Sequence, residues 1–410
     1  MSDKQQKDAP AYMLGSDQRQ EWMRDYFFAP RGIGFSEPGI VPLDDAAMSA
    51  YNVAKSSYQI HPDVFNMDYL SKAVGLGKNE IVKRLHRLYD EHLIMFVMNP
   101  ATQVYGWGLY YWLVKLKENT PRETKAKLSE WYQNKDDICT GYECSGDFDY
   151  FNGNHMRVLD NLLADVIEPW KNNPEIEFVH LCPIRRDIRE SNVNMWDAPG
   201  DSYRELFWGK DQLEKLAKIQ DKMDLTDLKI IQALNTKKPM EELFDFKVLA
   251  DISGLDPKEM LAGIKDVVEN KRILVPLFHL NFMKLGLTNH AYVIRLFQTI
   301  PSYRKAQIAD ELSRIPELNN VVEFTDSLYD ISVWAYNEIS DTKALKEKLN
   351  SYSEIEDIKE ADIYRQFRRW VCRMDDQNGF WEECVFTDDF LQDRTVKDGI
   401  KCSMARKEEE

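Results

Sequence analysis

The sequence of 410 residues lacks long apolar runs. Its hydrophobic stretches are short and interrupted, whereas a membrane-spanning helix needs about 20 consecutive apolar residues. Residues 1–10 are polar, so the apolar core of a signal peptide is missing as well. Cysteine is scarce, with six residues and no regular spacing, which is typical of proteins in a reducing compartment. These features indicate neither a membrane protein nor a disulfide-rich secreted domain, and we expect a cytoplasmic protein.

The motifs of several enzyme classes are also missing. No glycine-rich phosphate loop, nucleophile elbow or HExxH helix occurs in the sequence. Cys139 and Cys144 lie close together, but a zinc site favours a second close pair, and Cys372 and Cys384 are far apart without a histidine pattern. We therefore expect no metal site and no resident cofactor.

Acidic residues outnumber basic ones, 69 to 53, which gives a formal net charge of −16. A field of that sign repels phosphate backbones, so any nucleic-acid contact requires a locally basic face. Hydrophobic residues make up 43% and charged residues 30%, the balance of a soluble globular protein. The length exceeds that of one ordinary core and suits several modest domains.

The sequence does contain an internal repeat. In the first copy, Leu70 is followed by four residues and then by the Gly-Leu pair that begins at Gly75. In the second copy, Leu249 is followed at the same spacing by the Gly-Leu pair that begins at Gly254. The two copies lie about 180 residues apart, and such self-similarity indicates two units of one architecture.

Each copy opens with short helices around a tight glycine turn. In the second copy, a helix over 246–252 leads to the turn at Gly254, and a helix over 257–270 follows with Asp256 as its N-cap. In the first copy, the helix after the turn is expected over 78–91, where apolar residues recur at helical spacing. Helices joined in this way are typical of a helix-turn-helix.

An apolar segment follows each helix-turn-helix, at 93–98 and at 273–278, and is expected to be the strand or wing that closes it. Each copy then shows a β-α-β-β-α-β pattern, which is typical of a ferredoxin-like domain. In the first copy these elements are expected at 109–116, 120–133, 138–144, 148–152, 155–170 and 177–184. In the second copy they are expected at 291–297, 302–314, 320–325, 330–336, 342–350 and 355–363.

The predicted fold class is α+β, with two winged helix-turn-helix domains, each followed by a ferredoxin-like βαββαβ domain. The two sheets are expected to pack as an internal pseudo-dimer, with Trp112 and Tyr292 near the interface, because each sheet has one apolar face that needs cover. The expected domains are an N-terminal arm (1–45), helix-turn-helix 1 (46–98), ferredoxin-like domain 1 (99–200), a connecting helix (201–223), helix-turn-helix 2 (224–278), ferredoxin-like domain 2 (279–370) and a C-terminal tail (371–410).

A helix-turn-helix followed directly by a ferredoxin-like domain resembles the Lrp/AsnC family of bacterial and archaeal regulators. The resemblance implies a ligand-responsive transcriptional regulator that binds DNA, needs no membrane partner and is able to form homo-oligomers. The residues that carry it are 70–93, Gly106 and 146–150 in the first copy, and 249–273, Gly286, Tyr329 and Asp330 in the second.

Two alternatives stay open. The siroheme decarboxylases are a divergent branch with the same outline, and a resemblance to them implies a carboxy-lyase that binds haem or another tetrapyrrole. That branch carries a histidine in a stretch resembling Y-E-R-D-H before an N-M-W-F strand, whereas residues 140–149 and 322–330 contain none. The second alternative is a non-catalytic interaction protein that has lost DNA binding. The leading prediction is a regulator without enzymatic activity.

The helix expected over 78–91 carries the candidate DNA-binding residues Lys78, Lys83, Arg84 and Arg87. In the regulators that the chain resembles, such side chains contact phosphates and base edges. The alternative is a solvated helix face, because acidic residues lie close by. In the second copy the charges of the matching helix cancel.

The candidate ligand-binding residues are Asp149 and Asp330, at matched turns, and Arg186 and Arg365, at matched positions of the last strands. Paired arginines suit a carboxylate, and interfaces between domains are the usual place for a pocket. We therefore expect one small anionic or zwitterionic ligand per chain, bound between the two units. The alternatives are Asx turns for the aspartates and an exposed basic strand edge for the arginines.

The histidines are scattered, and His279 and His290 lie where helix-turn-helix and sheet meet in the second copy. A buried histidine with satisfied hydrogen bonds is favoured there over a metal or haem ligand.

Overall fold

The computed structural model describes much of the chain from residue 75 onward. The described residues are 75–90, 94–100, 108–134, 138–156, 159–190, 193–194, 225–236, 238–239, 242, 245–267, 274–280, 288–315, 318–325, 327–337, 339–369, 372–374 and 381–384. The expected N-terminal arm and connecting helix lie outside these residues, as do Leu70, Gly106 and Gly286.

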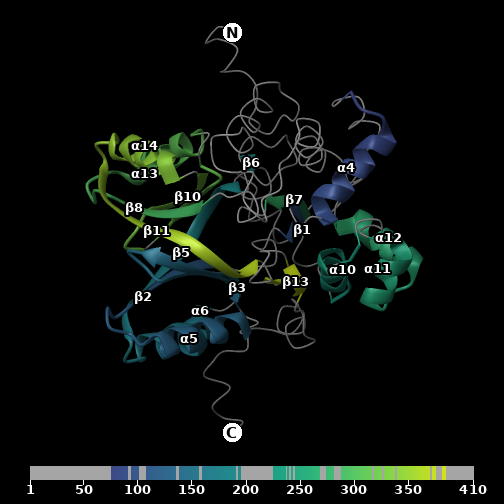
Figure 1. The fold of residues 1–410 in the computed structure, drawn as a ribbon, viewed down its shortest axis with the longest axis horizontal. Coiled ribbons are helices and arrows are strands. Elements are labelled where there is room, and N and C mark those ends of the chain that lie inside the picture. The colour runs from purple at the N-terminus through teal and green to yellow at the C-terminus, as the bar shows by residue number, and fades with distance from the viewer. Residues whose placement is uncertain are drawn as a thin grey trace.

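Eight strands from the two halves of the chain form one closed antiparallel barrel (Figure 1). The order around it is β11-β3-β4-β2-β5-β9-β10-β8, and β8 pairs with β11 to close the barrel. The first half contributes β2 (Gly108–Leu116), β3 (Ile138–Gly146), β4 (Tyr150–Met156) and β5 (Ile176–Glu190). The second half contributes β8 (Thr288–Leu296), β9 (Asn320–Phe324), β10 (Ile331–Asn337) and β11 (Ile355–Arg369).

The barrel overturns the predicted fold class of two winged helix-turn-helix domains, each followed by its own ferredoxin-like domain. β5 and β11 each have 15 residues, and each pairs with its own half near its start and with the other half near its end. The two seams are β5–β9, where Ile184 pairs with Phe324, and β11–β3, where Ile363 pairs with Cys144. The physical reason is that separate four-stranded sheets would leave unpaired backbone groups along their edges, and closure pairs these groups.

Helices cover the outside of the barrel, α5 and α6 on one side and α13 and α14 on the other (Figure 1). Phe367 of β11 is buried in the first half's core with Trp112, and Ile188 of β5 is buried in the second half's core with Tyr292. Each half therefore completes its core with a residue from the other. The helices are α5 (Arg122–Asn134), α6 (Leu159–Leu162), the π-helical turn η3 (Leu163–Ile167), α7 (Glu168–Lys171), α13 (Ser302–Leu312) and α14 (Ile339–Asn350).

Aromatic side chains fill the inside of the barrel and join the two halves. The ring of Trp334, from the second half, lies 4.9 Å from that of Tyr142 and 5.0 Å from that of Phe151, both from the first half. Tyr111 stacks on the same tryptophan at 6.2 Å. Gly153 leaves room for the Tyr111 ring, because a Cβ atom at position 153 would lie 2.9 Å from that ring.

The expected interface residues Trp112 and Tyr292 lie beneath the helices and not inside the barrel. Trp112 and Tyr292 belong to the two clusters beneath the helices. Because successive side chains of a strand point to opposite faces, their neighbours Tyr111 and Ala291 face the barrel interior. In the barrel interior, Tyr111 stacks on Trp334 of the other half. Trp112 and Tyr292 meet the other half beneath the helices instead, in the clusters that hold Phe367 and Ile188.

Four described helices lie beside the barrel: α4 (Lys78–Asp90), α10 (Leu225–Asn235), α11 (Phe246–Ser253) and α12 (Pro257–Lys265) (Figure 1). The predicted turn is confirmed, since Gly254 ends α11 with a left-handed φ of 70°. The predicted N-cap is confirmed too, because Asp256 accepts from the Lys258 amide and forms a capping box with Glu259.

The wing prediction is wrong for both copies. β1 (Ile94–Pro100) and β7 (Leu274–Leu280) pair with each other in a two-stranded antiparallel sheet, so each strand joins the two copies instead of closing its own unit.

Three short strands, β6 (Val193–Asn194), β12 (Cys372–Met374) and β13 (Trp381–Cys384), extend the barrel sheet. Within the described ranges, no helix is both long and apolar enough to cross a membrane.

Candidate functional site

The four candidate DNA-binding residues lie together on α4. Lys78 and Lys83 are exposed, whereas Arg84 and Arg87 are half-buried. The Arg84 Nε atom lies 2.8 Å from Glu80 Oε1 one helical turn earlier, so part of the basic surface is neutralised within the helix. Lys78 and Lys83 are thus the exposed basic residues of the set, and lysine side chains suit contacts with phosphate oxygens.

The opposite side of α4 holds the helix in place. Leu88 and Tyr89 are buried, and the Tyr89 hydroxyl donates a hydrogen bond of 2.8 Å to the backbone carbonyl of Lys238. Lys238 belongs to the second copy, so α4 is fixed against the other half of the chain.

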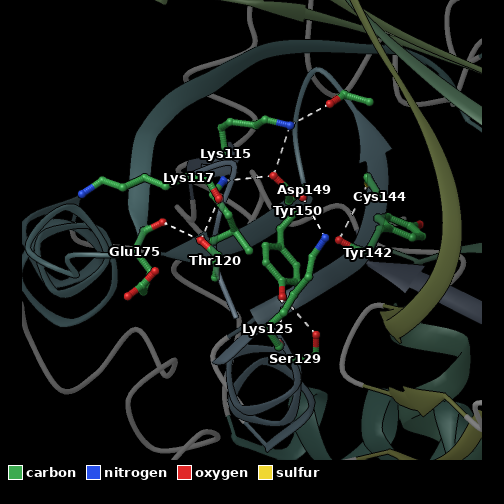
Figure 2. A network of polar contacts seen from close by, with 12 residues as sticks. Lys115, Lys117, Thr120, Lys125, Ser129, Tyr142, Cys144, Asp149, Tyr150 and Glu175 are labelled. Carbon is green, nitrogen blue, oxygen red and sulfur yellow. Dashed lines mark hydrogen bonds and ion pairs between the residues drawn. The ribbon is translucent and has the colours of Figure 1, made fainter. Parts of the chain in front are cut away.

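The first candidate ligand residue, Asp149, is held by contacts within the first half. Its Oδ2 atom accepts a hydrogen bond of 3.0 Å from the Leu116 amide, and its Oδ1 atom lies 2.8 Å from the Lys125 Nζ atom of α5. Figure 2 shows the carboxylate between Lys125 and Lys115, whose Nζ atom is 3.3 Å away. The carboxylate thus ties the turn after β3 to the end of β2 and to α5.

Asp330 repeats this arrangement in the second half. Its Oδ2 atom accepts a hydrogen bond of 2.7 Å from the Leu296 amide, and its Oδ1 atom lies 2.6 Å from the Lys305 Nζ atom of α13. Both aspartates therefore stabilise a turn in their own half through a strand amide and a helix lysine. The sequence repeat predicted that they match, and the structure adds a lysine partner to each.

The arginine Arg186 connects the two halves at the β5–β9 seam. Its Nε atom contacts Glu323 of β9, and its Nη1 atom lies 3.1 Å from Asp310 of α13. Its Nη2 atom also donates to the Ala306 carbonyl at 3.1 Å. The arginine side chain is 7% exposed and that of Glu323 is 4% exposed, so this ion pair is buried.

Arg365 occupies the matching place in the β11–β3 seam, but its contacts are looser. Its Nη1 atom lies 3.4 Å from Glu143 Oε2, and the arginine side chain is 28% exposed. Its guanidinium also lies 4.7 Å from the centre of the Phe367 ring. The two arginines thus serve two different seams, where each pairs with a carboxylate of its own chain.

The barrel brings His180 of β5 against the turn that contains Tyr329. The imidazole stacks on Phe178 at 4.4 Å and meets the edge of the tyrosine ring at 6.0 Å. Next to it, the Ser327 hydroxyl lies 3.2 Å from the Cys182 sulfur. Burial lowers the pKa of His180 and raises the pKa of Cys182 to about 12 and that of Tyr329 to about 12. The site therefore holds a neutral imidazole beside two protonated acids near neutral pH.

This group could not be found by inspecting the turn alone. Residues 322–330 contain no histidine, and His180 comes from the other half of the chain. The turn lies over β5 because the Thr325 amide donates to the Pro183 carbonyl at 3.0 Å, beside the β5–β9 seam. Only a prediction of that seam would have brought these residues together.

His290 is a buried histidine whose two ring nitrogens both have partners. Its Nδ1 atom lies 2.6 Å from Asp362 Oδ1, and its Nε2 atom lies 3.0 Å from the Thr342 hydroxyl. These contacts agree with the satisfied histidine favoured from the sequence. The His279 side chain lies outside the described residues. In the described part of the chain, no group of three or more His, Cys, Asp or Glu residues suits a metal ion.

Comparison with known proteins gives likenesses of fold. No protein-family model and no curated protein matches the chain. Among solved structures, the siroheme decarboxylase NirDL shares 11% identity and a TM-score of 0.50, covering 84% of this chain and 96% of that one. Escherichia coli AsnC shares 14% identity and a TM-score of 0.28, covering 35% of this chain and 93% of that one.

A transcriptional regulator of Neisseria meningitidis, solved in complex with L-Met, shares 12% identity and a TM-score of 0.29, covering 37% of this chain and 97% of that one. The predicted resemblance to siroheme decarboxylases is thus confirmed as a likeness of fold. Lrp/AsnC regulators are also among the similar solved structures, each over about a third of this chain. At these identities the likeness concerns the fold and leaves the activity open.

Proposed function

We propose that this protein is a cytoplasmic, ligand-responsive DNA-binding regulator of the Lrp/AsnC kind, and that α4 is the helix that contacts DNA. The observation that supports the proposal is the concentration of positive charge on α4 in an acidic chain. Residues 78–90 hold four basic and two acidic side chains, a formal net charge of +2, whereas the whole chain has −16. A locally basic face of this kind is what an acidic protein needs to approach a phosphate backbone.

The test is the salt dependence of binding to a random-sequence duplex, followed by fluorescence anisotropy. Four phosphate contacts give a slope of log K against log salt of about −3.6, and each lost contact flattens it by about 0.9. Lys83→Ala should therefore flatten the slope by one step. Lys343→Ala is the matched control, because Lys343 is an exposed lysine on α14, with a side chain 85% exposed. Binding without salt dependence in the wild type would remove the main support for a regulator.

The proposed ligand is small and anionic or zwitterionic, and it binds between the two halves with Asp149, Asp330, Arg186 and Arg365 as the candidate residues. Because the two arginines lie in different seams, one small ligand would use one of them and not both. All four side chains have partners within the chain. A ligand carboxylate would have to compete with the glutamates that pair with the arginines, and a ligand ammonium group with the lysines that pair with the aspartates. Arg365 is the member most able to exchange its partner, because its ion pair is longer and more exposed than that of Arg186. Calorimetry with amino acids and aromatic acids should show weaker binding to Arg365→Ala, and unchanged binding would remove this arginine from the site.

The second candidate is a carboxy-lyase that acts on a tetrapyrrole. It is favoured by one observation, the position of His180 against the Tyr329 turn, where residues 322–330 offer no histidine of their own. Burial lowers the pKa of the imidazole, which favours its neutral form, and one ring nitrogen then remains available as an acceptor or ligand. Titration with an iron tetrapyrrole, followed by absorbance, tests this reading. A spectral change that is lost in His180→Ala would favour the lyase, and no change in the wild type would count against it.

A further inference from the structure

The two copies of the glycine turn allow the helices that follow them to be compared position by position. Gly75 and Gly254 both adopt a left-handed conformation, with φ of 73° and 70°. α4 begins three residues after the first glycine and α12 three residues after the second. Leu88 and Val267, which match in this alignment, are both fully buried. The alignment therefore agrees at the turn, at the start of the two helices and at this buried position.

The basic residues of α4 have no basic counterparts on α12. The positions that match Lys78, Lys83, Arg84 and Arg87 hold Pro257, Ala262, Gly263 and Asp266. Over 13 matched positions, residues 78–90 carry a formal net charge of +2, with four basic and two acidic side chains. Residues 257–269 carry −1, with two basic and three acidic side chains.

The first turn of α12 is also occupied by acidic side chains. Asp256 and Glu259 form the capping box, so two carboxylates lie at the helix N-terminus. A helix N-terminus normally attracts phosphate, but these carboxylates satisfy its amides and repel a second anion. The two carboxylates at its N-terminus therefore disfavour contact between α12 and a nucleic-acid backbone.

We infer that each chain presents a single DNA-reading helix, α4, and therefore recognises one half-site of duplex DNA, although its fold contains two copies of the helical unit. This inference rests on the proposed function. An ordinary symmetric dimer of DNA-binding units reads two half-sites related by a twofold axis. Here the fused chain keeps the pairing of the copies through β1 and β7 but keeps the basic surface on one copy only. A sequence with one half-site binds one chain, and an inverted repeat binds two chains.

The test begins with enrichment of tight-binding sequences from a random duplex library, followed by the stoichiometry of the complex by analytical ultracentrifugation. Lys83 and Lys258 are both exposed lysines on the matched helices, so they make a controlled pair. At 0.1 M salt, losing one phosphate contact lowers affinity by about eight-fold, which follows from a slope change of about 0.9. Lys83→Ala should show this loss, and Lys258→Ala should bind as the wild type does.

The outcomes separate this inference from the proposed function. One chain on a single half-site, with loss only in Lys83→Ala, supports the inference, as do two chains on an inverted repeat with the same pattern. One chain bound across an inverted repeat, with equal losses in Lys83→Ala and Lys258→Ala, overturns the inference and leaves a DNA-binding regulator in place. No enriched sequence and no salt-dependent binding in the wild type overturn the proposed function itself.

Discussion

Replacing Arg186 by alanine tests the β5–β9 seam of the barrel directly. The arginine is buried, and it pairs with Glu323 of β9 and Asp310 of α13, both from the other half of the chain. Its removal leaves the Glu323 carboxylate, with a side chain 4% exposed, without its main buried partner. Breaking a buried ion pair from one side costs about 3–5 kcal/mol. Arg185 also contacts Glu323 at 3.0 Å, so we expect the lower end, about 3 kcal/mol.

The chain contains its own matched control. Arg365 occupies the same position of the other seam, but it is 28% exposed and its ion pair with Glu143 measures 3.4 Å. An ion pair of that kind contributes about 1 kcal/mol or less, so Arg365→Ala should cost clearly less than Arg186→Ala. The ratio of the two costs is a property of the barrel and does not depend on what the protein binds.

The measurement is urea unfolding followed by tryptophan fluorescence and circular dichroism, with the two variants and the wild type compared at one pH. The double variant Arg186→Ala/Glu323→Ala should recover part of the lost free energy, because it removes the uncompensated charge as well. Equal costs for Arg186→Ala and Arg365→Ala would refute the reasoning that the β5–β9 seam is the tighter one. The reasoning would also be refuted if the double variant lost more unfolding free energy than the two single variants together.

Two further predictions concern the polar groups of the barrel. Asp149→Asn and Asp330→Asn should each destabilise the fold by about 1–3 kcal/mol, because the side chain keeps its size but loses the lysine ion pair and part of the strand-amide hydrogen bond. Thermal unfolding measures this loss. An unchanged unfolding midpoint in both variants would contradict the structural role. Stability should fall as pH rises above about 9, by up to about 1.4 kcal/mol per pH unit, because the pKa of Cys182 is raised from 9.0 to about 12 and the unfolded chain loses this proton first. Cys182→Ala should flatten that decline, and an alkaline decline of unchanged slope would exclude the thiol as its cause.

Local features of the fold were predictable because short-range rules determine them. The Gly254 turn, the Asp256 N-cap and the start of α12 at Pro257 all follow from residue preferences within a few positions. The strands also lie close to their expected positions, since the apolar pattern marks them. Closure of the barrel could not be predicted in this way. It depends on pairing between segments such as 140–146 and 361–369, and nothing local in either segment names its partner.

The same limit applies to the candidate site. The match of Asp149 with Asp330, and of Arg186 with Arg365, is visible in the repeat, and the structure places each pair at equivalent positions. The partners of the two arginines are not visible in the repeat, because each partner comes from the other half of the chain. Arg186 pairs with Glu323, and Arg365 pairs with Glu143. Lys83 on α4 is exposed, and its contact with DNA stays a prediction. His180 is the residue that inspection of the turn could not supply.

The exchanged last strands also affect how the chain folds during synthesis. β3 is an edge strand of the first half until β11 arrives, and the paired residues Gly146 and Ala361 are separated by about 215 positions. At a synthesis rate of about 5–20 residues per second, the edge waits about 11–43 s for its partner. During that time β3 presents unpaired backbone groups to any neighbouring nascent chain. Expression yield should therefore respond to translation speed and to chaperone supply between residue 146 and residue 361, more strongly than thermodynamic stability alone would suggest.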